Sequence, residues 1–438
     1  MIQLINKKKA IVIAIANALF AHNTLADVAP KSHIGLLGFD FQSDVEAQYG
    51  YDDNVTYQKN NEVGSDFYSI KPKVGLVGER KGTRLEFFYE GDYRDYLTDD
   101  EDPLYPYDAD SDEYFDHNFG MYSDFQFGKR SNLTFNIANA MGHEERGQGV
   151  TEGFTGKQLS RYGVDEVIKT NFFSSSLGYS YLRPESSNSL HFEAGYAKLS
   201  YYDLDDDLDA DLKTYISREE WHSLTLSADL LSQWSSVTRA RYSVINIQRH
   251  YEEKKAKNTN EYYFLFGLKS QLTGKTAFEG NIAWMIKTFP ENNDAEDDGS
   301  FNWDINLTWE PVRHSRFDLY TKQSVEDADE AGGYILNTTY GIKWKHSWWV
   351  DQLSTTTGYE YTTNNHTNSG GRKDDTTIAL FKINYDFRPS ISFELLYQLD
   401  LNNSNRDTED FDMVEGNTVT RTLGYDKSFS MFLIKVKI

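Results

Sequence analysis

Apolar and polar residues alternate with a period of two along most of the chain. The clearest segment is 301–310, where Phe, Trp, Ile, Leu and Trp share one parity and Asn, Asp, Asn, Thr and Glu share the other. This period places successive side chains on opposite faces of a β-strand. The apolar face runs from Phe301 to Trp309. A strand of that length, tilted as in outer-membrane barrels, spans about 20 Å and approaches the apolar band of about 25 Å.

The same alternation recurs through the chain and predicts about 18 strands. They are expected at 42–53, 66–78, 82–97, 113–128, 131–146, 164–182, 188–203, 212–232, 236–252, 259–272, 275–290, 299–311, 315–326, 333–348, 350–364, 374–388, 390–403 and 425–438. We interpret 418–424 as an extension of the last strand, because a barrel with both termini in the periplasm needs an even number of strands. The final residues also alternate, although the chain ends on Ile438 rather than on the aromatic residue typical of barrels.

Short and long connections alternate between these segments. The short ones carry Gly, Pro, Asn or Ser, at 79–82, 129–132, 183–186, 273–275, 310–313 and 388–390. The long ones are acidic and lack periodicity, at 98–112, 147–163, 203–211, 291–299, 326–332, 363–375 and 403–415. Alternation alone would also suit a soluble β-sandwich. The connections instead predict an all-β, antiparallel up-and-down transmembrane barrel of 16–18 strands, with short periplasmic turns and long acidic extracellular loops.

The N-terminus has the layout of a secretory signal peptide. Three lysines at 7–9 precede an apolar stretch at 10–21 and a small-residue exit that ends at Ala26. The stretch is shorter than the roughly 20 residues of a spanning helix, which disfavours a retained anchor. We therefore expect cleavage near Ala26, a short periplasmic segment at 27–41 and a barrel at 42–438 in the outer membrane of a Gram-negative bacterium.

The composition excludes several further classes of protein and of site. The 438 residues contain 44 Lys and Arg against 68 Asp and Glu, a net charge of −24, and no cysteine. This acidity disfavours a nucleic-acid binder. Without cysteine the chain forms no disulfide, thiolate metal site or cysteine-linked lipid anchor.

Charged residues fall mainly on the polar parity, which would face the lumen. Twelve basic and eleven acidic positions share that face, so the lumen is expected to be nearly neutral. The candidate lumen-lining residues are Arg84, Glu86, Glu90, Asp92, Arg94, Trp221, Arg239, Arg241, Asp304, Lys343 and Lys382. Opposite charges on neighbouring strands could simply pair and hold the wall. They could also form a hydrogen-bonding track for a polyhydroxylated solute.

Trp221 has two interpretations. It shares the polar parity with Ser223, Thr225, Ser227 and Asp229, so it could stack on a sugar inside the lumen. A bulge near residue 221 would instead turn it outward into an aromatic girdle, and this is the interpretation we favour.

Two acidic runs are weak candidates for calcium. They contain Asp108, Asp110 and Asp112, and Asp205, Asp207 and Asp209. Carboxylates are ligands for Ca²⁺ or Mg²⁺, which could bridge these loops to lipopolysaccharide phosphates, but neither run completes an EF-hand loop. A solvated acidic loop is the simpler interpretation, and no resident cofactor is expected.

Catalysis has little support in the sequence. The close His and carboxylate clusters are His143-Glu144-Glu145 and His250-Tyr251-Glu252, and neither has a recognisable nucleophile motif. We expect a protein that is not an enzyme. An outer-membrane hydrolase stays an alternative, for which His143→Ala would abolish activity.

Several short motifs resemble a known family. They are Tyr-Gly-Tyr-Asp-Asp-Asn-Val at 49–55, Gly-Ser-Asp-Phe-Tyr at 64–68, Lys-Pro-Lys-Val-Gly-Leu at 71–76, Tyr-Glu-Gly-Asp-Tyr at 89–93 and Gly-His-Glu-Glu-Arg-Gly at 142–147. The chain is similar here to the outer-membrane β-barrel porins of exopolysaccharide gene clusters, the Vps-type outer-membrane proteins. The resemblance is densest over 42–147. It implies a barrel associated with synthesis or export of a biofilm polysaccharide, and it brings no catalytic residues.

We therefore expect a passive conduit for an exopolysaccharide. The alternatives are a structural or surface-attachment barrel with a closed lumen that binds polymer or cations, and a general porin for small sugars. The expected partners are outer-membrane lipid, lipopolysaccharide, a polysaccharide or sugar, the barrel-insertion machinery and periplasmic exopolysaccharide export proteins.

Overall fold

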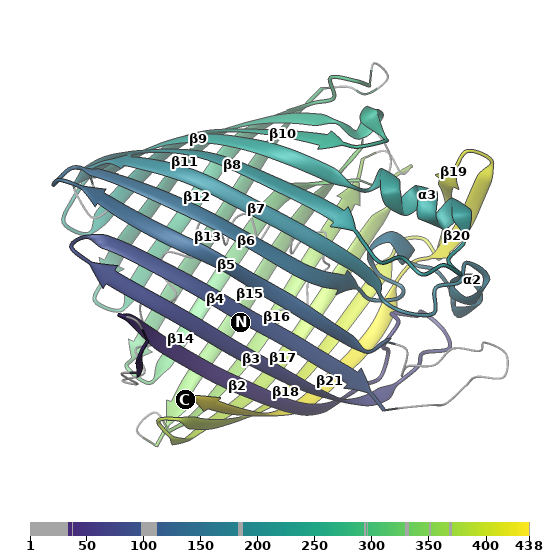
Figure 1. Ribbon diagram of the computed structural model, residues 1–438, viewed down its shortest axis with the longest axis horizontal. Coiled ribbons are helices and arrows are strands. Elements are labelled where there is room, and N and C mark those ends of the chain that lie inside the picture. Colours follow the sequence, from purple (N-terminus) through teal and green to yellow (C-terminus); the bar gives the residue numbers. More distant parts are fainter. Residues whose placement is uncertain are drawn as a thin grey trace.

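The computed structural model describes residues 34–36, 38–97, 112–182, 187–292, 295, 297–328, 333–349, 352–367 and 370–437. In this part of the chain, eighteen antiparallel strands form one closed barrel, as the sequence predicts (Figure 1). The strands are β2 (Phe39–Asp52), β3 (Ser65–Arg80), β4 (Thr83–Tyr96), β5 (Tyr114–Phe127), β6 (Ser131–Glu144), β7 (Ile168–Tyr181), β8 (Asn188–Tyr201), β9 (Trp221–Gln233), β10 (Thr238–Tyr251), β11 (Thr259–Thr273), β12 (Thr276–Thr288), β13 (Asp298–Val312), β14 (Ser315–Asp327), β15 (Tyr334–Trp348), β16 (Leu353–His366), β17 (Lys373–Arg388), β18 (Ile391–Ser404) and β21 (Tyr425–Lys437). The last strand closes the barrel because β21 pairs with both β18 and β2. A three-residue strand, β1 (Ile34–Leu36), pairs with the start of β2.

Tight turns connect neighbouring strands at one end of the barrel. Between β3 and β4, Lys81 and Gly82 have φ angles of 49° and 81°. Two successive positive φ angles form the hairpin turn whose twist matches that of the flanking strands. Glycine adopts this region without the steric cost that a Cβ imposes, which explains its place at this turn.

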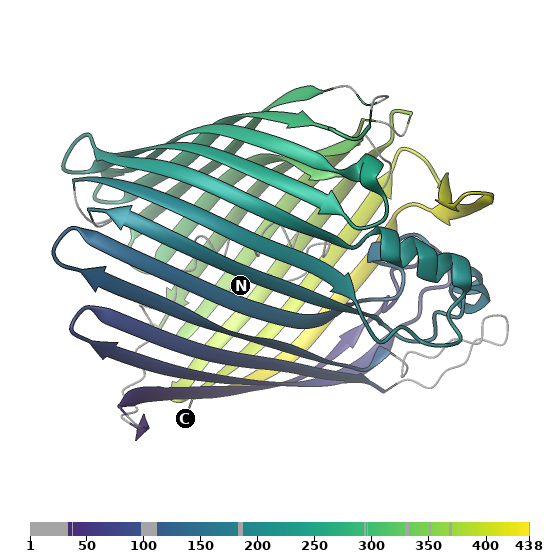
Figure 2. The same ribbon diagram turned by 45° about the horizontal axis from the view of Figure 1, so that its top comes forward.

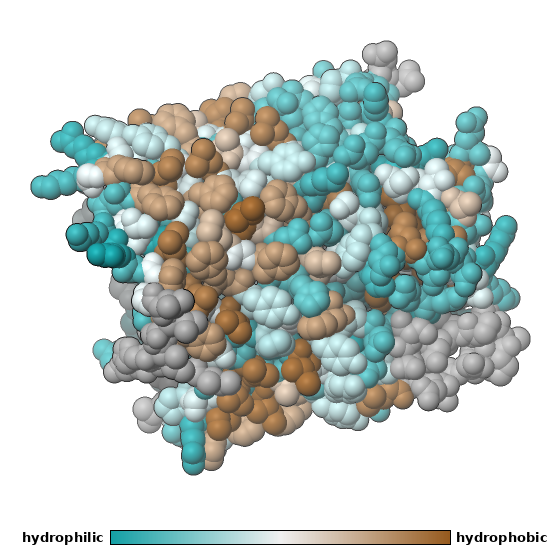
Figure 3. Space-filling view, in the orientation of Figure 1, coloured by the Kyte–Doolittle hydropathy of each residue, from teal (hydrophilic) through white to brown (hydrophobic). Residues whose placement is uncertain are grey.

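The outer surface is apolar over only part of its height. On β10, the outward residues Tyr242 and Val244 are 41% and 49% exposed, and Asn246, Gln248 and His250 continue the same parity toward the long loops. In the space-filling view, apolar side chains gather on the half of the wall near the short turns, and hydrophilic ones cover the half near the long loops (Figure 3). Strands of 13 to 16 residues are taller than the apolar band, so the wall extends beyond the membrane on the loop side.

The long loops carry the helices and a hairpin. These elements are η3 (Gly149–Thr151), α2 (Gly156–Arg161), α3 (Ala210–Arg218), η4 (Lys255–Lys257) and the pair β19 (Thr408–Val414) and β20 (Asn417–Thr422). Figure 2 shows α2, α3 and the β19–β20 hairpin together at the end of the barrel opposite the short turns. None of the described helices is long and apolar enough to cross a membrane.

The prediction of a strand at 212–232 is wrong over its first residues, because 210–218 form α3. Asp209 caps this helix by accepting hydrogen bonds from the Asp211 and Leu212 amides. Leu212, Tyr215 and Ile216 are buried on one face, at the spacing of a helix. The helix therefore forms where the loop packs against an apolar surface.

The interpretation of 418–424 as an extension of the last strand is also wrong. Residues 408–422 form a separate two-stranded hairpin, which reverses next to Gly416 at a φ of 85°. Gly424, with a φ of 88°, separates this hairpin from β21. The predicted aperiodic loop at 403–415 accordingly contains β19.

Candidate functional site

The inner wall of the barrel is lined by charged side chains that face one another across strand pairs. On β4, Arg84, Glu86, Glu90, Asp92 and Arg94 share the parity opposite to Phe87, which is 40% exposed on the outside. The register places Glu90 beside Lys73 of β3, and their charged groups lie 2.9 Å apart. Arg84 pairs with Glu86, and Asp92 with Lys71.

Similar pairs occur around the rest of the wall. Lys435 lies 2.8 Å from Glu46 and 3.0 Å from Asp44, Arg241 lies 2.7 Å from Asp229, and Lys382 lies 2.7 Å from Glu394. Arg239 donates from Nε to Gln233 at 3.4 Å, and Asp304 stands opposite Lys322 in the register. Lys343 lies on the lumen-facing side of β15. Most of these positions combine donors with acceptors, which suits hydroxylated solutes.

Arg94 differs from the other candidates because aromatic rings surround it. Its guanidinium carbon lies 4.4 Å from the Phe67 ring centroid and 5.7 Å from those of Tyr114 and Phe429. The side chain is 8% exposed, and it donates to the Tyr96 hydroxyl at 3.4 Å. Cation–π attraction stabilises a desolvated guanidinium. Arg94 therefore lies in a packed part of the wall rather than in open lumen.

The favoured interpretation of Trp221, a bulge that turns it outward, is wrong. The register of β9 with β8 and β10 runs through Trp221 without a shift. The side chain points inward, is 5% exposed, and packs with Phe172 at 6.2 Å between ring centroids. The Arg249 guanidinium lies 4.6 Å from the Trp221 ring centroid. This aromatic contact buries Trp221 at the loop end of the inner wall.

An ion cluster that the sequence analysis missed lies next to Trp221. Lys287 of β12, 1% exposed, contacts Glu261 of β11 at 2.8 Å and also pairs with Asp327. Asp327 pairs in turn with Arg249 of β10. Extending the parity of β12 from Glu279 to Lys287 would have placed this lysine inside the barrel.

Three long loops share one hydrophobic core. We call segments 145–167, 202–220 and 405–424 the loop cap. Its core includes Phe154, Leu159, Leu212, Ile216 and Phe411, drawn from all three segments. The 53–64 loop joins the cap, since the Gln58 side chain donates to the Phe154 carbonyl at 2.9 Å. The extracellular end thus carries a packed structure rather than separate solvated loops.

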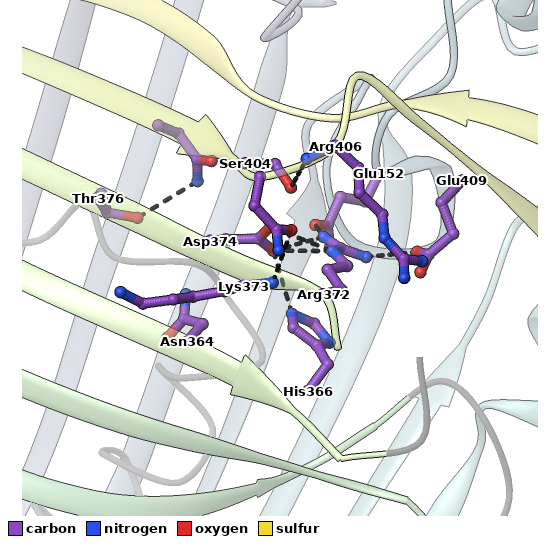
Figure 4. Close-up of polar contacts among 12 residues, drawn as sticks. Glu152, Asn364, His366, Arg372, Lys373, Asp374, Thr376, Ser404, Arg406 and Glu409 are labelled. Carbon is purple, nitrogen blue, oxygen red and sulfur yellow. Dashed lines mark hydrogen bonds and ion pairs between the residues drawn. The ribbon is translucent and has the colours of Figure 1, made fainter. Parts of the chain in front are cut away.

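Buried charges tie the loop cap to the wall (Figure 4). Arg372 donates to Asp374 at 2.9 Å and to Glu409 at 2.6 Å, and its guanidinium lies 3.6 Å from Glu152. Arg421 also reaches Glu409, at 2.9 Å. Burial alone would lower the pKa of Arg372, but Glu152 and Asp374 raise it above its ordinary value. Arg372 therefore stays charged and joins β17, the β19–β20 hairpin and the loop after β6.

Three of the acidic candidates for calcium, Asp112, Asp205 and Asp209, have other partners. Asp112 accepts from Arg146 at 2.7 Å, and burial raises the pKa of this carboxyl although Arg146 opposes the shift. Asp205 accepts from the Asp207 amide at 3.0 Å, and Asp209 caps α3. Asp108 and Asp110 lie outside the described residues. Within the described part of the chain, no group of three or more His, Cys, Asp or Glu residues is placed to hold a metal ion.

His143 lies in a packed position. Its Nδ1 is 2.8 Å from Asp116, and its ring stacks on Tyr114 with 3.8 Å between centroids. The side chain is 4% exposed. Its neighbour Glu144 accepts from the Tyr201 hydroxyl at 3.1 Å and from the Val150 amide at 2.8 Å. This segment of β6 therefore anchors the loop cap to the wall.

Comparisons with known proteins agree with this architecture. Residues 243–420 match the model of a family described as "Putative beta-barrel porin 2". The fold is similar to that of a BenF-like porin from Pseudomonas fluorescens Pf-5, with a TM-score of 0.51 and 8% identity over 91% of this chain and 99% of that one. It is also similar to Pseudomonas aeruginosa OpdK, crystallised with vanillate, with a TM-score of 0.50 and 11% identity over 91% and 98% of the two chains. No curated protein sequence matches the chain significantly. The protein has the fold of a porin-like outer-membrane barrel.

Proposed function

We propose that this porin-like outer-membrane barrel is a passive conduit for an exopolysaccharide of the biofilm matrix. The observation that carries the proposal is the inner wall, where paired charges line a closed barrel of eighteen strands. Barrels of 16 to 18 strands leave room for an aqueous channel. A wall rich in both donors and acceptors exchanges hydrogen bonds with sugar hydroxyls and carries little net field.

The choice of an exopolysaccharide over other polar solutes comes from the motifs at 49–55, 64–68, 71–76, 89–93 and 142–147. Their resemblance to barrels of exopolysaccharide gene clusters also favours periplasmic export proteins as partners. The proposal gives the protein no catalytic role.

Planar-bilayer recording tests the conduit. The purified protein should form channels with weak selectivity between K⁺ and Cl⁻, because most wall charges are paired. Deletion in the producing bacterium should reduce the polysaccharide outside the cell and leave its cytoplasmic synthesis intact. A correctly folded barrel that never conducts, together with unchanged secretion, would contradict the proposal.

The loop cap favours a second candidate, a surface-attachment barrel whose lumen is closed. Among the described residues, the core of the cap together with Ile168 of β7 comprises thirteen buried residues, so the extracellular end carries a packed unit. This candidate predicts that wild-type protein is silent in bilayers and that Leu212→Ala, which loosens the cap, produces conductance. The conduit predicts conductance in both proteins.

A further inference from the structure

Among the described residues, two neighbouring lysines of β15 lack the ion pairs that several other wall lysines have; Lys322 of β14 also has none, but it stands opposite Asp304. Lys73, Lys382 and Lys435 each lie within 3 Å of a carboxylate oxygen, at 2.9, 2.7 and 2.8 Å. Lys343 and Lys345 of β15 have no hydrogen bond or ion pair with any residue that the structure describes. A cation without a protein partner on a wet wall is free to bind an anionic ligand.

These lysines belong to a compact group that we call the β15 patch, which consists of Arg316, Lys343, Lys345 and Lys382. Arg316 stands opposite Lys345 on β14. On the other side, Thr356 of β16 separates Lys345 from Lys382 of β17. Standard strand geometry places Lys343 and Lys345 about 7 Å apart and Lys345 about 10 Å from Lys382. Lys343 is repelled by the other three cations and attracted by Asp318.

The carboxylates near the β15 patch are already engaged. Asp318 stands opposite Lys343, but it accepts from Arg316 Nε at 2.9 Å and from the Thr308 hydroxyl at 2.6 Å. Glu394 is paired with Lys382. Glu310 lies 3.9 Å from Arg316, and Glu360 of β16 accepts from the Tyr320 hydroxyl. These four carboxylates contact Arg316, Lys382 or Tyr320, so within the described part of the chain Lys343 and Lys345 keep no direct counter-ion.

An aromatic ring lies beside the β15 patch. A Cβ added to Gly341 would lie 2.0 Å from the Tyr320 ring, so this ring covers Gly341, two residues from Lys343. Its hydroxyl donates to Glu360 at 2.8 Å, which fixes the ring across the wall. Gly358 stands opposite Lys343, so β16 presents no side chain at that position of the inner wall. An aromatic face beside cations fits a sugar ring that carries a carboxylate.

The β15 patch lies near the end of the barrel that carries the short turns. Arg316 is the second residue of β14, and Lys345 is three residues from the end of β15. On the outside at this depth, Trp344 stacks on Phe317 with 6.0 Å between ring centroids, as in an interfacial aromatic girdle. Short turns are periplasmic, so a chain exported from the periplasm would meet this patch on entry.

We propose that the β15 patch binds a carboxylate-bearing saccharide, with the lysines on the carboxylates and Tyr320 against the sugar ring. This inference rests on the proposed conduit and names its substrate class as an acidic rather than a neutral polysaccharide.

The test uses channels of the purified mature protein, with tri-galacturonic acid and maltotriose as probes. Tri-galacturonate added on the periplasmic side should block the current at a concentration at least about tenfold lower than maltotriose, because two unpaired cations attract it. The block should weaken between about 0.1 M and about 1 M salt as the Debye length shortens.

Paired variants locate the site. Lys343→Gln/Lys345→Gln should lose about tenfold in block by tri-galacturonate, whereas Lys343→Arg/Lys345→Arg should keep it. Lys269→Gln/Lys275→Gln removes the same charge outside the patch and should keep the block, since Lys269 is already 2.9 Å from Glu279. Equal block by both probes, or equal loss in both Gln variants, would overturn the inference. A wild-type protein that never conducts would instead remove the proposed conduit.

Discussion

Charged residues of the wall have different energetic roles according to their burial. Lys269 and Glu279 form a pair near the periplasmic end, with side chains 71% and 54% exposed, and such pairs contribute little to stability. Lys287 is 1% exposed between Glu261 and Asp327. Removing one member of a buried cluster leaves the opposite charges in a desolvated site, which is costly.

We therefore expect Lys287→Ala to lower the free energy of unfolding by about 3 kcal/mol. Lys269→Ala, the matched control, should change it by less than about 1 kcal/mol. Urea titration in phospholipid vesicles, followed by tryptophan fluorescence, measures both values. Equal losses in the two variants would show that burial does not set the cost.

Parity in the sequence also separates the inner residues, but it does not indicate burial. It placed Arg84 and Arg94 on the same face of β4, where the structure also has them. It did not show that Arg94 is enclosed by Phe67, Tyr114 and Phe429, because those rings come from three other strands.

At the scale of elements, the wall strands and the loop elements are stabilised differently. Each wall strand pairs with two neighbours along its length, so alternation and turn residues suffice to predict it. The helix α3 and the β19–β20 hairpin are short and depend on contacts with each other. The wall strands therefore follow from the sequence, whereas α3 and the β19–β20 hairpin lie where the alternation predicts strand or aperiodic loop.

We expect Leu212→Ala in α3 to loosen the loop cap and leave the barrel folded. Leu212 is fully buried, and a core truncation of this type costs about 2–5 kcal/mol, which is large for a small unit. Limited proteolysis should cleave the cap of this variant faster, while its heat-modifiable mobility on gels stays that of a barrel. The neighbouring variant Thr214→Ala, at an exposed position whose hydroxyl donates to the Ala210 carbonyl of the same helix, should match the wild type. Unchanged cleavage of Leu212→Ala would show that the core does not hold the cap.

At the scale of the whole molecule, the membrane decides which face of each strand is apolar. A barrel reverses the arrangement of a soluble sheet, with apolar side chains outward toward lipid and polar ones inward. Phe264 of β11 is 51% exposed on the outside, opposite Trp284 of β12. Its neighbour Leu265 has the opposite parity and faces the lumen.

Phe264→Arg should accordingly lower the free energy of unfolding in bilayers by about 2–4 kcal/mol, because it places a cation in hydrocarbon. Leu265→Arg, one residue away, should cost clearly less because its side chain can reach water in the lumen. Equilibrium unfolding from vesicles compares the two. A larger loss for Leu265→Arg would reverse the assignment of the faces.

By itself, the sequence determined the closed barrel, the approximate number of strands and the end that carries the long loops. These properties follow from local alternation and turn chemistry, which each segment carries independently of the others. Only the tertiary structure decided the inward burial of Trp221, the cluster around Lys287 and the packed loop cap. It likewise left Lys343 and Lys345 unpaired beside Tyr320. These features depend on which side chains of distant segments meet, and a period of two contains no information about that.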